Sequence, residues 1–153
     1  MRKRAPQERA KNFEEVALGY SPEEALKEAE RCLLCKNPLC VKGCPVEIDI
    51  PGFIKEIREG RFLLALKKIK ETNLLPGICG RVCPQETQCE AKCIRNRKGD
   101  AVAIGSLERF VADYGREKGE DKLKVRNKKG IKVAVVGSGP AGLSCAGELV
   151  RMG

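Results

Sequence analysis

Two short stretches decide the fold: residues 32–45 read CLLCKNPLCVKGCP, and residues 79–93 read CGRVCPQETQCEAKC. They form a near-repeat that holds eight of the nine cysteines in two runs of four. An odd total does not suit a disulfide framework, and clustered cysteines inside a cell are more often ligands than disulfide partners. The sequence therefore predicts a small domain held together by metal-thiolate bonds.

Composition narrows the class of protein further. The chain has 153 residues, of which 33% are charged and only 4% aromatic. Its apolar core is therefore small, and we expect disulfides or bound metal to supply additional stability. The N-terminal basic residues are followed by no apolar stretch typical of a secretory signal. The longest apolar run, residues 62–66, is far short of the roughly 18 residues that cross a membrane. We expect a cytoplasmic protein with no membrane partner.

The net positive charge leaves nucleic-acid binding open as a second possible function. The net charge is +9, and residues 94–130 carry eleven Lys or Arg against six Asp or Glu. A basic stripe can bind nucleic acid, but no aromatic platform or nucleic-acid motif accompanies this one. We favour a solvated face or linker neutralised by an anionic cofactor or an acidic partner. A zinc-stabilised nucleic-acid module is the alternative.

Apolar residues recur at helical spacing around both cysteine runs, which predicts a mainly α domain. The stripes are interpreted as faces of the core. The expected helices are one from Pro22, with Ser21 as N-cap and Glu24 closing a capping box; one after Asp49 that ends at Gly60; one through Phe62, Leu66 and Ile69 that stops before Asn73 and Pro76; and one capped by Ser106 that runs to Tyr114.

The C-terminal stretch changes character. Residues 131–136, IKVAVV, are typical of a buried strand, and a G-x-G-x-x-G turn follows. Such a turn between a strand and a helix brings backbone N–H groups to the pyrophosphate of a dinucleotide. Cys145, in the helix after the turn, is expected to be a buried packing residue. The candidate cofactor-binding residues are Gly137, Ser138, Gly139, Pro140, Ala141 and Gly142.

Spacing also favours one kind of metal centre. His is absent, so His-ligated zinc is excluded, although two four-cysteine zinc sites remain possible. The first run ends in Cys44-Pro45, as in bacterial ferredoxins, where the fourth cysteine of each run binds the other cluster. Cys93 would then join Cys32, Cys35 and Cys40, and Cys44 would join the second run. That run offers Cys79, Cys83 and Cys89, and spacing does not exclude Cys79 as a ligand.

The cysteine runs, residues 102–110 (VAIGSLERF) and residues 135–142 (VVGSGPAG) together resemble the small (β) subunit of NADPH-dependent glutamate synthase and related FAD/iron-sulfur oxidoreductases. Those relatives include the N-terminal domain of dihydropyrimidine dehydrogenase and the large subunit of NADH-dependent ferredoxin:NADP oxidoreductase. The resemblance implies two 4Fe-4S clusters in a helical domain, followed by domains that bind FAD and NAD(P)H. One cluster would be held by Cys32, Cys35, Cys40 and Cys93, and the other by Cys44, Cys83, Cys89 and the side-chain oxygen of Glu108, with Cys79 as the alternative to Glu108.

These expectations combine into one functional hypothesis. Residues 1–125 would be the helical cluster domain, and 126–153 the start of a truncated Rossmann-type FAD domain. The resemblance implies an NAD(P)H-dependent oxidoreductase whose clusters pass electrons from FAD to a large catalytic subunit, such as the glutamate synthase α subunit, or to ferredoxin. No catalytic acid, base or nucleophile is expected within these residues. A cluster domain kept only as a structural brace is a further alternative.

Overall fold

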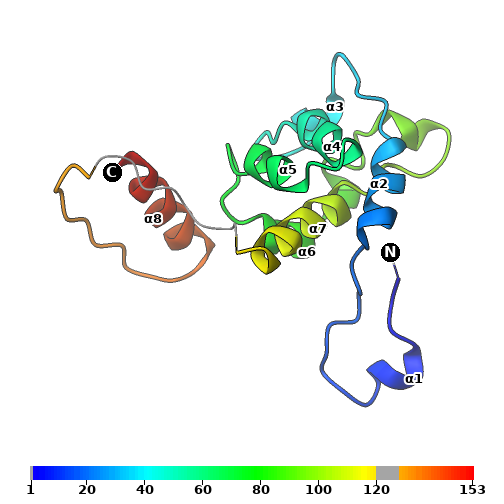
Figure 1. Ribbon diagram of the computed structural model, residues 1–153, viewed down its shortest axis with the longest axis horizontal. Helices are drawn as coiled ribbons and strands as arrows, with labels where there is room; N and C mark the ends of the chain where they lie inside the picture. Colours follow the sequence, from blue (N-terminus) through cyan, green and yellow to red (C-terminus); the bar gives the residue numbers. More distant parts are fainter. Residues whose placement is uncertain (1, 120–127) are drawn as a thin grey trace.

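The computed structural model describes residues 2–119 and 128–153, and the described residues are helical (Figure 1). Two 3-10 turns, η1 and η2, lie between the sixth and seventh helices. The elements are α1 (Pro6–Arg9), α2 (Pro22–Glu30), α3 (Leu39–Lys42), α4 (Ile50–Arg58), α5 (Phe62–Ile69), α6 (Pro76–Val82), η1 (Gln85–Thr87), η2 (Ile94–Arg97), α7 (Ile104–Glu117) and α8 (Pro140–Met152).

The expected starts and stops of the early helices are confirmed. The Ser21 hydroxyl accepts the backbone N–H of Glu24, whose carboxylate accepts the N–H of Ser21, so α2 begins with a capping box. The Asp49 carboxylate caps α4 by accepting the N–H of Gly52. After α4, Gly60 has a φ of +71°, a left-handed conformation that ends a helix at little cost only for glycine.

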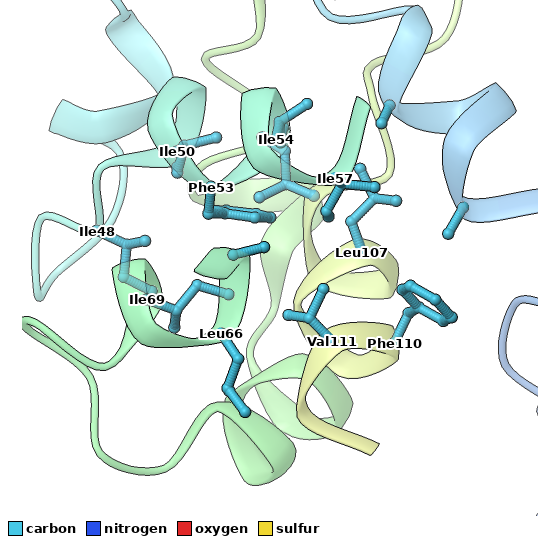
Figure 2. Close-up of a cluster of buried hydrophobic side chains, with 14 of the residues drawn as sticks. Ile48, Ile50, Phe53, Ile54, Ile57, Leu66, Ile69, Leu107, Phe110 and Val111 are labelled. Carbon is cyan, nitrogen blue, oxygen red and sulfur yellow. The ribbon is translucent and has the colours of Figure 1, made fainter. Parts of the chain in front are cut away.

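The core lies between α4, α5 and α7, with α2 and α6 packed on the same group (Figure 2). The apolar stripes predicted from the sequence are its faces. Phe62 of α5 stacks edge-on against Phe110 of α7, with ring centroids 5.0 Å apart. Fully buried side chains are Phe53, Ile50, Ile54, Ile57, Ile69, Leu107, Val102 and Val111. Their burial holds together the helices and turns that carry the two cysteine runs.

The predicted start of α7 is wrong by three residues, nearly one helical turn. The sequence suggested Ser106 as the N-cap, but α7 begins at Ile104. Two carboxylates from distant segments accept its first N–H groups: Glu28 accepts the N–H of Ala103 at 2.8 Å, and Glu90 accepts that of Gly105 at 3.1 Å. Because these caps come from tertiary contacts, the helix starts before its own cap-forming residue.

The predicted strand at residues 131–136 does not form in the described part of the chain. A strand needs a hydrogen-bonded neighbour, and the described residues provide none beside it; only an isolated antiparallel bridge joins Lys3 and Ala17. The helix after the glycine turn, α8, forms as expected. Cys145 within it is exposed rather than buried, since no sheet covers that face. The part of the chain that the structure describes is therefore mainly α, and it does not show the first Rossmann strand.

Two further predictions concern the limits of the chain's parts. The expected boundary between residues 125 and 126 lies outside the described residues, as do Lys122, Lys124 and Arg126 of the basic stripe. Where the two described parts meet, Arg151 of α8 donates a hydrogen bond to the backbone carbonyl of Lys70 at 2.9 Å.

Among the described residues, every helix is too short or too polar to cross a membrane.

Candidate metal centre

Four cysteines line one pocket of about 70 Å³ near the start of α4. Three come from the first run, and the fourth, Cys93, comes from the second. Within the first run Leu34 has a φ of +46°, an uncommon left-handed conformation for a large side chain that turns the chain between two cysteines. The pocket is otherwise largely apolar. Its cysteines are Cys32, Cys35, Cys40 and Cys93, and its apolar wall includes Ile50, Ile54, Val102 and Ile104.

The pKa values of the pocket thiols show that the same four cysteines lie close together. Burial, together with the nearby charges of Cys32 and Cys93, raises the pKa of Cys40 to about 11. Burial likewise raises the pKa of Cys32, with added effects from Cys35 and Cys93. These thiols are neutral at pH 7 without a metal, and a bound cation would favour their thiolate forms. The structure thus brings together the four residues expected to share one cluster.

The remaining predicted ligands form a second group between α6, α7 and η1. Burial raises the pKa of Cys89 to about 12, with Glu90, Cys44 and Glu108 as contributing charges. Burial also raises the pKa of Cys83 to about 11, and Cys79, Glu108 and Cys44 again contribute. Cys44 of the first run therefore lies with the second run. Cys44 thus lies near the second run and Cys93 near the first, which is the placement that a crossed ligand set would need.

Glu108 and Cys79 both lie in this second group. Glu108 is 6% exposed although it carries a carboxyl group, and burial raises its pKa to about 7. Asn73 donates a hydrogen bond to Glu108 Oε1 at 2.8 Å, and the Cys79 thiol donates to Asn73 Oδ1 at 3.7 Å. A single asparagine thus contacts both candidates for the fourth ligand position.

The donor set, four cysteine thiols around one largely apolar pocket, fits an iron-sulfur cluster. Among residues 2–119 and 128–153, no three His, Cys, Asp or Glu side chains converge closely enough to hold one metal ion. A tetrahedral zinc needs four sulfurs, each about 2.3 Å from a single centre. In a four-iron cluster each thiolate binds its own iron, so the ligands stand farther apart around a wider space. Cys32, Cys35, Cys40 and Cys93 could each supply one such thiolate from the wall of the pocket.

The glycine turn before α8 contains two positions that only glycine suits. Gly137 has a φ of +108°, and a Cβ at Gly142 would collide with the Gly137 carbonyl, so both positions require glycine. A Cβ at Gly139 would meet no heavy atom of the described chain within 4 Å. Its backbone is therefore open to the approach of a ligand, as the middle glycine of the motif requires.

Residues 9–120 match the family model described as dihydropyrimidine dehydrogenase domain II, 4Fe-4S cluster. This match covers both cysteine runs and all of α7. The chain belongs to this family. The dihydropyrimidine dehydrogenase domain II family binds iron-sulfur clusters, in agreement with the cofactor expected from the cysteines.

Curated relatives of this domain II chain are oxidoreductases. It is 44% identical to the glutamate synthase (NADPH) small chain of Halomonas elongata, over 99% of this chain and 32% of the relative. Identity to the corresponding Escherichia coli K12 protein is 43%, over 92% of this chain and 30% of the relative. The NAD-dependent dihydropyrimidine dehydrogenase subunit PreT of E. coli O157:H7 is 38% identical, over 92% and 34%. The chain spans about a third of the length of these proteins.

Sequence reasoning missed two residues of the domain II site. Asn73 was interpreted only as part of a helix stop, because an asparagine before a proline is an ordinary turn signal. Glu90 lies next to Cys89 in the second run, but nothing in the local pattern shows that it caps α7. Both make contacts between segments far apart in the sequence, and a single sequence carries no periodic signal for such contacts.

Proposed function

We propose that this chain is the cluster-binding electron-transfer domain of an NAD(P)H-dependent FAD oxidoreductase of the glutamate synthase small-subunit type. One observation carries the proposal: Cys93 lies in the same pocket as three cysteines of the first run. A crossed set of this kind is the ligand pattern of two-cluster ferredoxins, whose clusters carry electrons.

The proposed ligands follow from the two groups of side chains. The pocket cysteines hold the first cluster, which lies against apolar side chains that exclude water from it. The second cluster is held by three cysteines, and Glu108 supplies the fourth ligand in place of Cys79. The first set is Cys32, Cys35, Cys40 and Cys93, and the second is Cys44, Cys83, Cys89 and Glu108.

The division of the chain is part of the same proposal. Residues 1–125 bind the clusters, and residues 126–153 begin an FAD domain whose pyrophosphate site is the turn from Gly137 to Gly142. The strand at 131–136 would form once neighbouring strands of that domain pair with it. A reducing cytoplasm keeps the cysteine thiols available for iron.

The clusters would carry single electrons between an NAD(P)H-reduced FAD and a partner. The glutamate synthase small chains among the relatives suggest a large catalytic subunit as that partner. Ferredoxin is the alternative electron-accepting partner. In either case the chain's own residues bind the clusters, shield them from water and fix their separation.

Metal analysis of the anaerobically purified chain tests the proposal. We expect eight irons and eight acid-labile sulfides, from two clusters of four. A chain with about two zincs and no sulfide would overturn the proposal and favour the zinc-stabilised nucleic-acid module. NAD(P)H reduction of the clusters in the full-length protein separates electron transfer from a purely structural role, in which the clusters would stay oxidised.

Double substitutions test the crossover itself. We expect Cys93→Ala to remove four irons, and Cys93→Ala with Cys32→Ala to remove the same four. Cys93→Ala with Cys83→Ala should remove all eight, because the two residues serve different clusters. The matched control is Cys145→Ala, an exposed cysteine outside both groups, which should keep all eight. Uncrossed sets would reverse the outcomes of the two double variants.

A further inference from the structure

Asn73 is a buried polar residue that touches both candidates for the last ligand of the second cluster. It follows α5 and is 6% exposed. Its Nδ2 donates to Glu108 Oε1 at 2.8 Å, and its Oδ1 accepts from the Cys79 thiol at 3.7 Å. Oδ1 also accepts the backbone N–H of Leu75 at 2.9 Å. Both the nitrogen and the oxygen of the Asn73 amide therefore form hydrogen bonds.

The backbone fixes which end of the amide faces which partner. An amide flip would turn the two Nδ2 protons toward the Leu75 N–H, so two donors would face each other. Such an arrangement leaves buried donors unpaired, which disfavours the flipped amide. Leu75 thereby keeps Oδ1 on the side of Cys79 and Nδ2 on the side of Glu108.

We propose that Asn73 is a positioning residue that selects Glu108 over Cys79 as the fourth ligand of the second cluster. This inference rests on the crossed ligand sets proposed above. The Nδ2 donor occupies Oε1 of Glu108, so Oε2 is the oxygen that Asn73 leaves for another partner. The Oδ1 acceptor holds the Cys79 thiol in a hydrogen bond at 3.7 Å, which a sulfur bound to iron would have to give up.

The two halves of this contact act in the same direction. The donor favours a carboxylate oxygen acceptor at Glu108, and the acceptor favours a protonated sulfur at Cys79. Without the Asn73 amide, Cys79 could replace Glu108. An iron-oxygen bond would break, an iron-sulfur bond would form, and the thiol proton would pass to the freed carboxylate, so that charge and protons balance.

Substitution of Asn73 tests the inference through spectroscopy and iron content. In Asn73→Ala we expect eight irons, a changed EPR signal from the reduced second cluster, and a more negative midpoint potential. The potential falls because a thiolate donates more electron density to iron than a carboxylate does. Asn73→Ser keeps an oxygen that can accept the Leu75 N–H but is too short to reach Glu108. It should give the same changes with the turn intact.

The decisive comparison places Cys79→Ala in both backgrounds. With Asn73 present, Cys79→Ala should keep eight irons and the wild-type EPR signal. With Asn73→Ser, Cys79→Ala should lose four irons, since neither ligand is then held in place. The matched control is Asn96→Ala in η2, an exposed asparagine, which should leave iron content, EPR signal and potential unchanged.

Two results would overturn the selection role. One is wild-type EPR and potential in both Asn73 variants, with no iron lost when Cys79→Ala is added. The other is loss of four irons in both Asn73 variants while Cys79 is still present. The proposed ligand sets fail separately: Glu108→Ala would then keep eight irons in the wild-type background, and Cys79→Ala would lose four.

Discussion

Gly80 of α6 lies directly against the backbone of Arg109 in α7. A Cβ at Gly80 would stand 2.6 Å from the Arg109 backbone nitrogen and 2.8 Å from its Cα. Each of these residues follows a candidate ligand, Cys79 in α6 and Glu108 in α7. Close backbone contact between the two helices therefore brings the candidate ligands of the second cluster together.

Gly80→Ala should force α6 and α7 apart, because the atoms it meets belong to backbone and cannot rotate away. Overpacking of this kind costs about 1–3 kcal/mol. We expect a lower thermal unfolding midpoint and loss of iron from the second cluster only. The control is Gly77→Ala, also in α6, whose Cβ would meet only Ala112 Cβ at 3.8 Å. It should keep eight irons and match or exceed wild-type stability.

Phe62 joins α5 to α7 through edge-on contacts with Phe110 and Tyr114. Phe62→Leu keeps an apolar side chain but loses these ring contacts, each worth about 0.5–1.5 kcal/mol. Two such contacts lower the thermal midpoint by about 2–12 °C, at about 2–4 °C per kcal/mol. Leu63→Ala, at an exposed neighbouring position, should change it by less than a degree or two. Equal effects of the two substitutions would contradict the packing described for the core.

Arg109 ties the N-terminal segment to α7. Its guanidinium donates to the Ala17 carbonyl at 2.8 Å and forms ion pairs with Glu15 and Asp113. The side chain is 7% exposed, so a hydrogen bond from this charged group is worth about 1.5–3 kcal/mol. We expect Arg109→Ala to expose the segment before α2 to proteolysis. Arg116→Ala removes an exposed partner of Asp113 and should leave the cleavage rate unchanged.

Glu90 caps α7 from outside the helix, so its removal should loosen the first turn. Loss of a capping acceptor costs about 0.5–2 kcal/mol. Glu90→Ala should speed amide hydrogen exchange at Gly105, whereas Glu90→Gln keeps an acceptor oxygen and should stay near the wild-type rate. Glu86→Ala, on the exposed side of the same run, is the control. Faster exchange in that control would place the effect elsewhere than in the cap.

Sequence reasoning succeeded where a local pattern decides the structure. The Ser21 capping box, the Asp49 cap and the apolar stripe from Phe62 to Ile69 are all local, and the structure has them. Ferredoxin-style spacing also pointed to Cys93 as a neighbour of the first run, and Cys93 lines the pocket with Cys32, Cys35 and Cys40.

Other features depend on contacts that spacing does not encode. The start of α7 is set by Glu28 and Glu90, which lie 75 and 15 residues from the amides they accept. The strand at 131–136 fits β propensity, but propensity alone cannot supply a hydrogen-bonding neighbour. Asn73 resembles any other turn residue until its amide is seen between Glu108 and Cys79.

The crossed pocket has a consequence for biosynthesis. Its wall combines Cys32 with Cys93 and Ile104, so a ribosome must extrude the chain beyond Ile104 before the pocket can close. Cofactor insertion during translation of the first cysteine run alone would lack one of its four ligands. A cluster in this pocket would therefore have to wait until the residues up to Ile104 have been made and folded, whether or not synthesis continues beyond them.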